Sequence, residues 1–119
     1  MAVRKKRLSN PEYHLQCLII EFLKIQLHKS ALLTCFPSGG GGKIRGAMLK
    51  RMGLVAGWPD LQIIFKGKYY GLEVKTEKGK VSENQKAIHD SLIKQGAKVA
   101  VVRTPEEAWI QIKEWGLGR

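Results

Sequence analysis

Two acidic residues and a lysine lie close together in the middle of the chain, and their types suit metal-dependent hydrolysis. Asp60 directly precedes an apolar run over residues 61–65, and a second run over residues 69–75 contains Glu73 and Lys75. Two carboxylates that approach each other repel unless a cation lies between them, and their oxygens suit Mg²⁺ or Mn²⁺. An ammonium group beside such an ion can orient the attacking water or offset charge in the transition state. The combination indicates hydrolysis of a phosphodiester.

Two antiparallel strands are the elements that must bring these groups together. The residues Lys66-Gly67-Lys68 separate the two apolar runs, which is a pattern typical of a β-hairpin. Antiparallel pairing places the start of the first strand beside the end of the second, so Asp60 can approach Glu73. Side chains alternate along a strand, so Glu73 and Lys75 share a face, about 7 Å apart. The alternative is an accident, because Glu-x-Lys on a solvent-facing strand is ordinary in a chain rich in both residues.

The residues around the hairpin resemble the core of the VRR-NUC family, within the PD-(D/E)XK nuclease superfamily. The matching motifs are Gly57-x-Pro59-Asp60, Gly71-Leu72-Glu73-Val74-Lys75-Thr76, and Gly79-x-Val81-Ser82 followed by Gln85. The resemblance extends upstream to Glu12, with Gln16, and to residues 37–45, so it covers nearly the whole chain. It implies a restriction-endonuclease-like α/β core, in which a small mixed sheet is flanked by helices. It also implies a metal-dependent DNA endonuclease.

The resemblance implies roles for the residues of the second strand and its partner. Asp60, Glu73 and the backbone carbonyl of Val74 would bind one or two Mg²⁺ or Mn²⁺ ions. Lys75 would position the attacking water. We therefore expect a loss of Asp60 or Glu73 to remove metal binding and activity together.

Glu12 and Gln85 are the two further catalytic residues that the resemblance implies. Glu12 lies in the first turn of a helix expected over residues 11–28, where an acid also favours the positive end of the helix dipole. Gln85 forms a capping-box pattern with Ser82, which accounts for it without catalysis. In the family both side chains face the site, so we expect them to assist around the metal or the nucleophile, with Glu12 as a further metal ligand.

The composition points to an anionic partner. Lys and Arg number 21 against 10 Asp and Glu, a net charge of +11, which favours DNA. The sequence contains no apolar span long enough to cross a membrane, so we expect no membrane partner. The candidate phosphate contacts lie in a short helix expected over residues 43–52 and after the hairpin: Lys43, Arg45, Lys50, Arg51, Lys78, Lys80 and Lys86.

The chain is long enough for one domain, which we expect over residues 11–119, after a basic, flexible arm over residues 1–10. The arm has no apolar signal segment, so a cytoplasmic protein of a bacterium or a virus-infected cell is expected. The glycine run over residues 39–42 reads equally well as a flexible linker or as a loop that contacts DNA. Cys17 and Cys35 lack metal-ligand spacing and are expected in the core. His89 is expected at the surface.

The remaining pattern predicts a strand over residues 31–36, a helix ending near Gln95, an inner parallel strand over residues 98–102 and a last helix that begins after Thr104. Trp109, Ile112 and Trp115 follow helical spacing and predict a stripe that packs in the core or against a second copy.

Free-standing members of the family resemble junction-resolving enzymes, which implies selectivity for branched DNA such as Holliday junctions. A branched substrate with two-fold symmetry needs two cuts, and a chain with one site supplies both only as a homodimer. The alternative from a different class is a non-catalytic, basic nucleic-acid-binding module, in which the carboxylates are a surface accident. An RNA-binding protein also fits the charge, but the sequence has no RRM, KH or zinc-knuckle pattern.

Overall fold

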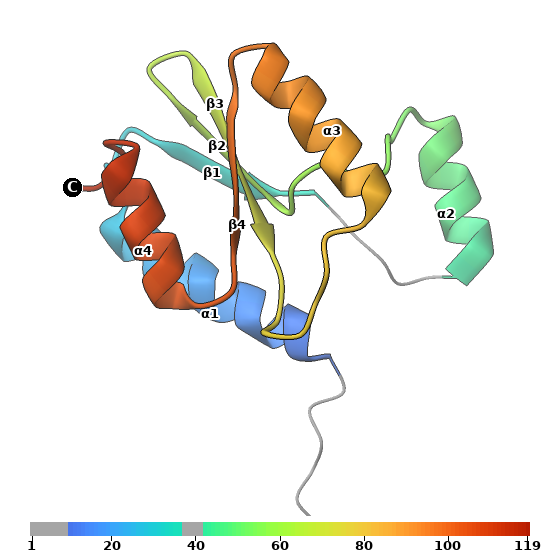
Figure 1. The fold of residues 1–119 in the computed structure, drawn as a ribbon, viewed down its shortest axis with the longest axis horizontal. Helices are drawn as coiled ribbons and strands as arrows, with labels where there is room; N and C mark the ends of the chain where they lie inside the picture. The colour runs from blue at the N-terminus through green and yellow to red at the C-terminus, as the bar shows by residue number, and fades with distance from the viewer. Residues whose placement is uncertain (1–9, 37–41) are drawn as a thin grey trace, which may run out of the picture.

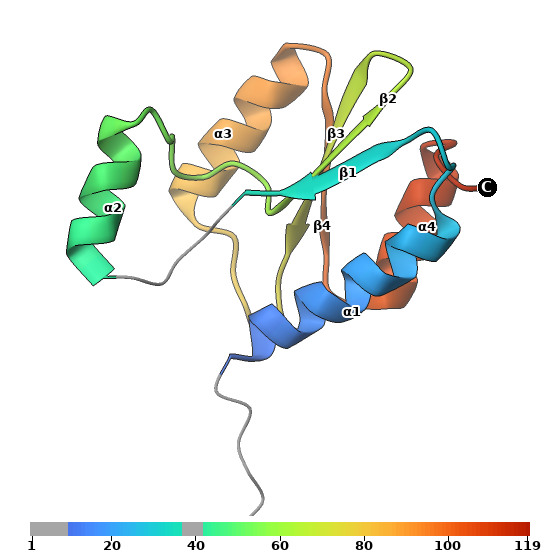
Figure 2. The ribbon, with the colours of Figure 1, turned by 180° about the vertical axis from the view of Figure 1, so that it is seen from behind.

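The computed structural model describes residues 10–36 and 42–119. The predicted N-terminal arm, except Asn10, and most of the glycine run lie outside these residues. The elements follow the order α1 (Pro11–Gln26), β1 (Leu32–Cys35), α2 (Gly42–Arg51), β2 (Leu61–Phe65), β3 (Lys68–Val74), α3 (Glu83–Lys94), β4 (Lys98–Val102) and α4 (Pro105–Glu114). Figure 1 shows their arrangement, and Figure 2 shows it from behind.

Three of the helices begin where side-chain caps predict. The Asn10 side chain accepts a hydrogen bond from the backbone N–H of Tyr13 at 3.1 Å, and a proline follows the cap. Ser82 and Gln85 form a complete capping box at the start of α3. The Thr104 side chain accepts a hydrogen bond from the backbone N–H of Glu107 at the start of α4, and a proline again follows the cap. Local sequence therefore determines these starts.

The sheet has four strands in the order β1-β2-β3-β4, antiparallel except for the parallel β3–β4 pair. The predicted hairpin is present, with Leu61 opposite Leu72. Lys66 and Gly67 form its turn with φ values of 50° and 75°, and a two-residue hairpin turn with two positive φ angles matches the right-handed twist of the strands. The sheet is mixed, as the sequence predicts.

The prediction that residues 98–102 form an inner strand is wrong. The strand β4 pairs with β3 alone among the described strands and lies at the edge of the sheet. Its apolar run arises because both α3 and α4 contact it, so helices cover its side chains although its outer backbone edge has no neighbouring strand. Side-chain burial and backbone pairing are independent here.

One face of the sheet forms the hydrophobic core with α1 and α4, whereas α3 packs over the other face (Figures 1 and 2). The C-terminal stripe belongs to this core: Ile112 is fully buried, and Trp109 and Trp115 pack against the cluster. The buried core residues are Ile19, Leu23, Leu27, Leu61, Ile63, Phe65, Tyr70, Leu72, Val74, Val102, Ala108, Ile112 and Leu117.

The helix α2 lies apart from the rest of the domain, beyond the start of α3 (Figure 1). None of its residues is buried, and its apolar Ile44 and Met48 are 79% and 60% exposed. Cys17 and Cys35 are also exposed, so the prediction that they pack in the core is wrong. Within residues 10–36 and 42–119, no helix combines the length and apolar character that a membrane span requires.

Candidate active site

The hairpin brings Asp60 and Glu73 together one residue beyond its last pair. Leu61 lies opposite Leu72, so the next position on each strand places the two acids on the same face. Asp60 is fixed there because its Oδ2 accepts a hydrogen bond from the backbone N–H of Val74 at 2.7 Å. Glu73 is fully buried and Asp60 is only 7% exposed. Two buried acids therefore lie side by side at the end of β3.

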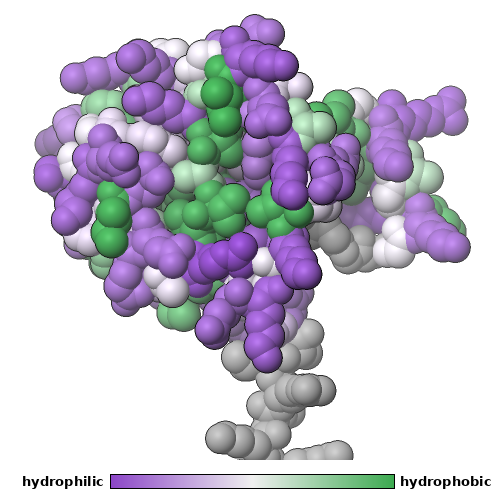
Figure 3. Space-filling view, viewed as in Figure 1, coloured by the Kyte–Doolittle hydropathy of each residue, from purple (hydrophilic) through white to green (hydrophobic). Residues whose placement is uncertain are grey.

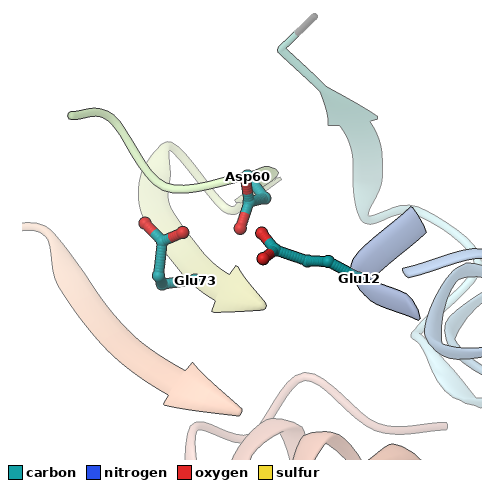
Figure 4. A group of neighbouring side chains, drawn as sticks. All are labelled: Glu12, Asp60 and Glu73. Carbon is teal, nitrogen blue, oxygen red and sulfur yellow. The ribbon is translucent and has the colours of Figure 1, made fainter. Parts of the chain in front are cut away.

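Glu12 completes the acidic cluster from a third element. It lies in the first turn of α1, and its carboxylate points toward Asp60 and Glu73 (Figure 4). One carboxylate oxygen from each of the three residues lies within 4.8 Å of the others. Residues far apart in the sequence thus bring three carboxylate groups close together.

The electrostatics of this acidic cluster, Glu12, Asp60 and Glu73, favour a cation. Burial, and then the neighbouring Asp60, raises the pKa of Glu73 from 4.5 to about 9, and Glu12 adds to the effect. Lys75 opposes it and lowers the pKa of Glu73. A divalent ion would favour the ionised form of each carboxylate, and an all-oxygen donor set suits Mg²⁺ or Mn²⁺. The residues present therefore fit such an ion.

Gln85 and His89 contact Glu73 from α3. The Gln85 side-chain N–H donates to Glu73 Oε2 at 3.4 Å, and His89 Nε2 lies 3.1 Å from Glu73 Oε1. His89 is 7% exposed, so the prediction of a surface histidine is wrong. Burial lowers the pKa of His89 and favours its neutral ring. The four-residue spacing from Gln85 is the sequence signal that could have found it, because it places both on one helix face.

Pro59 packs closely on Gly71 of β3, and this contact fixes the backbone directly before Asp60. A Cβ atom added at Gly71 would lie 2.6 Å from the Pro59 Cγ atom, so only glycine lets the proline ring rest on β3. The Gln62 side chain donates to the Pro59 carbonyl oxygen at 2.5 Å, and Tyr69 donates its hydroxyl to Gln62. Gly71 therefore acts through Pro59 on the position of Asp60.

The predicted phosphate contacts lie in two groups around the acidic cluster. Four are exposed on α2: Lys43, Arg45, Lys50 and Arg51. The exposed Lys78 and Lys80 lie on and after the 76–79 turn, and Lys86 forms an exposed ion pair with Glu83 at 3.3 Å. Hydrophilic side chains cover much of the face seen in Figure 3, including the protruding α2 region.

Arg103 holds the 76–79 turn, a role that sequence analysis missed. Its guanidinium group donates to the carbonyl oxygens of Thr76 at 2.7 Å and Gly79 at 2.6 Å, and more weakly to that of Glu77 at 3.4 Å. No local pattern predicts this contact because Arg103 lies on another strand connection, more than twenty residues away. The turn that carries Lys78 is thereby fixed.

A cavity of about 410 Å³ lies beside Asp60, between α2 and the segment before β2. Trp58 lies in its wall and is half-buried, so it is at the lip of the site and not in the core. Its ring contacts Phe36 and Tyr69, with centroids 5.8 and 6.1 Å apart. Asp60 of the acidic cluster and Gln85, which contacts Glu73, lie in the same wall, so the cavity borders the acidic cluster.

Comparisons with known proteins agree with one another. A family model described as the VRR-NUC domain matches residues 2–105. A solved structure named as a VRR-NUC domain protein has a TM-score of 0.74 at 24% identity, covering 95% of this chain and 93% of the other. A second, named as a VRR-NUC domain, has a TM-score of 0.58 at 24% identity, covering 87% and 94%. No curated protein sequence matches the chain.

Proposed function

Since the chain belongs to the VRR-NUC family, we propose that it is a metal-dependent endonuclease that hydrolyses DNA phosphodiester bonds. The observation that carries this proposal is the convergence of three carboxylates, from Glu12, Asp60 and Glu73, within 4.8 Å. Two of the three carboxylates, those of Asp60 and Glu73, are buried, whereas carboxylates that meet by accident on a surface would be exposed. The family match and this geometry agree, and together they support the proposal that the acidic cluster is an active site.

The ion in this proposal is Mg²⁺ or Mn²⁺, held by Asp60, Glu73, the backbone carbonyl of Val74 and Glu12. When bound, such an ion polarises a phosphoryl oxygen and lowers the pKa of a coordinated water. The protein's own contribution is to hold the ligands in place before the substrate arrives. The hydrogen bond from Val74 to Asp60, at 2.7 Å, does this for one ligand.

The residues around Glu73 have separate tasks in the proposed reaction. Lys75 is near enough to lower the pKa of Glu73, and its ammonium group would orient the attacking water and offset charge on the phosphate. Gln85 and His89 each contact one oxygen of Glu73, so they keep this carboxylate from rotating. Glu12 is only half-buried and would reach both the ion and the water.

Branched DNA, such as a Holliday junction, is the substrate that we propose, and a homodimer is the form that would cut it twice. The C-terminal stripe no longer supports the dimer, because its three residues pack in the core of one chain. The requirement for two cuts is the remaining support. We place this reaction in the cytoplasm of a bacterium or of a virus-infected cell.

A digestion series tests this proposal against a non-catalytic, basic binding module, which the net charge of +11 fits equally well. Four-way junction DNA and linear duplex are incubated with Mg²⁺, Mn²⁺ or EDTA, with Asp60→Asn as the control. We expect cleavage with either metal, fastest on the junction, and none in EDTA or with the variant. Binding to DNA without metal-dependent cleavage would establish the binding module instead. Light scattering on the same samples measures the dimer.

A further inference from the structure

The cavity beside Asp60 is built unlike a site for phosphate. It measures about 410 Å³, within the range of small-molecule sites, and its wall is largely apolar, with Leu49 and Leu54 from the α2 side. A phosphate needs positive charge, and among the described residues of this wall Lys50 is the one cationic side chain, whereas Asp60 adds a negative charge. The chemistry of the wall suits a flat, mostly apolar group with a polar edge.

Trp58 provides a stacking surface in this cavity. Its ring is held by edge-on contact with Tyr69 at an interplanar angle of 88° and by tilted contact with Phe36 at 60°. Neighbours that fix the plane of an aromatic ring prepare it to stack on a ligand without further ordering. Stacking of nucleobases on aromatic side chains is tolerant of base identity, because every base has a π-face.

The part of the wall that α2 contributes leaves room because it includes glycine. Gly42 and Gly46 of α2 line the cavity, and a Cβ atom added at either would meet no atom within 4 Å. This open space contrasts with Gly71, where a Cβ atom would collide with Pro59. Among the residues that the structure describes, none fills the space beside these two glycines.

The cavity adjoins the chemistry directly. Asp60 and Gln85 belong both to its wall and to the surroundings of the acidic cluster. Within one nucleotide the base and its phosphate lie side by side, so a base in the cavity would have its phosphate near the carboxylates. The basic residues of α2, which has no acidic residue, would then contact the flanking phosphates.

We propose that this cavity takes one unstacked nucleobase of the DNA substrate, next to the phosphate that is cut. This inference rests on the proposed nuclease function and adds that the nucleotide beside the cut is unpaired, as at a flap, at a bulge or at a junction whose central base pair has opened. A base inside an intact duplex must first leave its stack, which costs a few kcal/mol, whereas an unpaired base is already available. A second copy of the chain is the competing occupant. The apolar Ile44 and Met48, which such a partner would cover, do not line the cavity.

Photocrosslinking tests the cavity without depending on cleavage. A duplex with one unpaired 5-iodouracil is bound in EDTA and irradiated, and the crosslinked peptide is identified by mass spectrometry. We expect the crosslink at Trp58 or Phe36, and a much lower yield when the same 5-iodouracil is base-paired. Equal yields from paired and unpaired DNA, or crosslinks that map only outside the cavity, would overturn the proposal.

A pair of substitutions in α2 fills the cavity or leaves it open. Gly46→Leu places a side chain in the free space, whereas Ala47→Leu adds a leucine at the adjacent exposed position, outside the cavity. We expect Gly46→Leu to lower the preference for unpaired over paired DNA about tenfold, in binding and in cleavage, and Ala47→Leu to retain it. Trp58→Ala provides the same test if Gly46→Leu does not fold by circular dichroism.

The outcomes separate this inference from the nuclease function. A crosslink at Trp58 in a protein that cuts no DNA supports the base site and removes the nuclease. Metal-dependent cleavage with equal preference in wild type and Gly46→Leu retains the nuclease and overturns the base site. A change of oligomeric state in Gly46→Leu, measured by light scattering, would identify the cavity as a contact between copies and would also overturn the base site.

Discussion

The end of the β2–β3 hairpin and the helix α2 lie on two sides of the same cavity, but the protein holds them in opposite ways. Asp60 and Glu73 are buried and are fixed by hydrogen bonds with Val74, Gln85 and His89. The helix α2 has no buried residue and its charged side chains are exposed. Changes at the hairpin should therefore alter stability and chemistry together, whereas changes to the charged side chains of α2 should alter DNA binding and leave stability nearly unchanged.

The largest effect is expected from the buried acids themselves. Asp60→Asn or Glu73→Gln should lower the rate of DNA cleavage at least about 100-fold, because each removes a charged metal ligand. Both should also abolish the rise in melting temperature on addition of Mn²⁺. Glu77→Gln, an exposed carboxylate on the 76–79 turn, is the matched control and should behave as wild type. Full activity in Asp60→Asn would exclude the acidic cluster as the active site.

Two glycine substitutions compare the regions directly. Gly71→Ala should reduce the free energy of unfolding by about 1–3 kcal/mol, since its Cβ atom would lie 2.6 Å from Pro59 Cγ. It should also slow cleavage, because Asp60 follows the displaced proline. Gly46→Ala should instead stabilise the protein by about 0.5–1 kcal/mol, because it removes a glycine from a helix without a clash. Urea denaturation measures both, and equal effects would contradict the contrast.

The metal-free protein should lose stability as the pH rises between about 7 and 9. The folded state retains a proton on Glu73, whose pKa is raised to about 9, whereas the unfolded chain has lost this proton. His89 has a lowered pKa and stays neutral in this range. Thermal melts in EDTA should therefore show a falling melting temperature in wild type and a flatter profile in Glu73→Gln. Identical slopes would show that Glu73 is ionised in the folded protein.

The smallest effect is expected on α2. Lys50→Gln should weaken DNA binding several-fold and reduce the salt dependence of log K by about one, which corresponds to one lost phosphate contact. Its free energy of unfolding should change by less than about 0.5 kcal/mol, because Lys50 is exposed. Lys24→Gln, in the last turn of α1, is the control at the opposite end from Glu12 and should retain the wild-type affinity. Binding is measured by fluorescence anisotropy in a salt series.

Sequence reasoning predicted what depends on neighbours along the chain. The helix caps and the hairpin are local, so Asn10, Ser82 and Thr104 appear where their patterns predict. The approach of Asp60 to Glu73 follows from the hairpin register alone.

The features that sequence reasoning missed depend on how elements pack. His89 is buried only because α3 packs over the face that carries Glu73. The sequence of β4 does not show that the strand lies at the edge of the sheet. An apolar run indicates that side chains are covered, but it does not indicate how many strands pair with the backbone. The exposure of Cys17 and Cys35 likewise depends on which surfaces other elements leave free. The cavity arises because α2 lies apart from the rest of the domain, and no residue pattern predicts this separation.

The three carbonyl contacts of Arg103 have a consequence for molecular recognition. Because they fix the backbone of the 76–79 turn in the folded chain, the entropy of ordering this turn is lost during folding and not when a ligand arrives. The backbone of Lys78 is therefore already fixed, and only the rotamers of its side chain remain to be ordered when a ligand binds. Arg103→Gln would remove the charge-assisted contacts to these carbonyl groups, and the turn would regain freedom that every encounter with a polyanion must then remove.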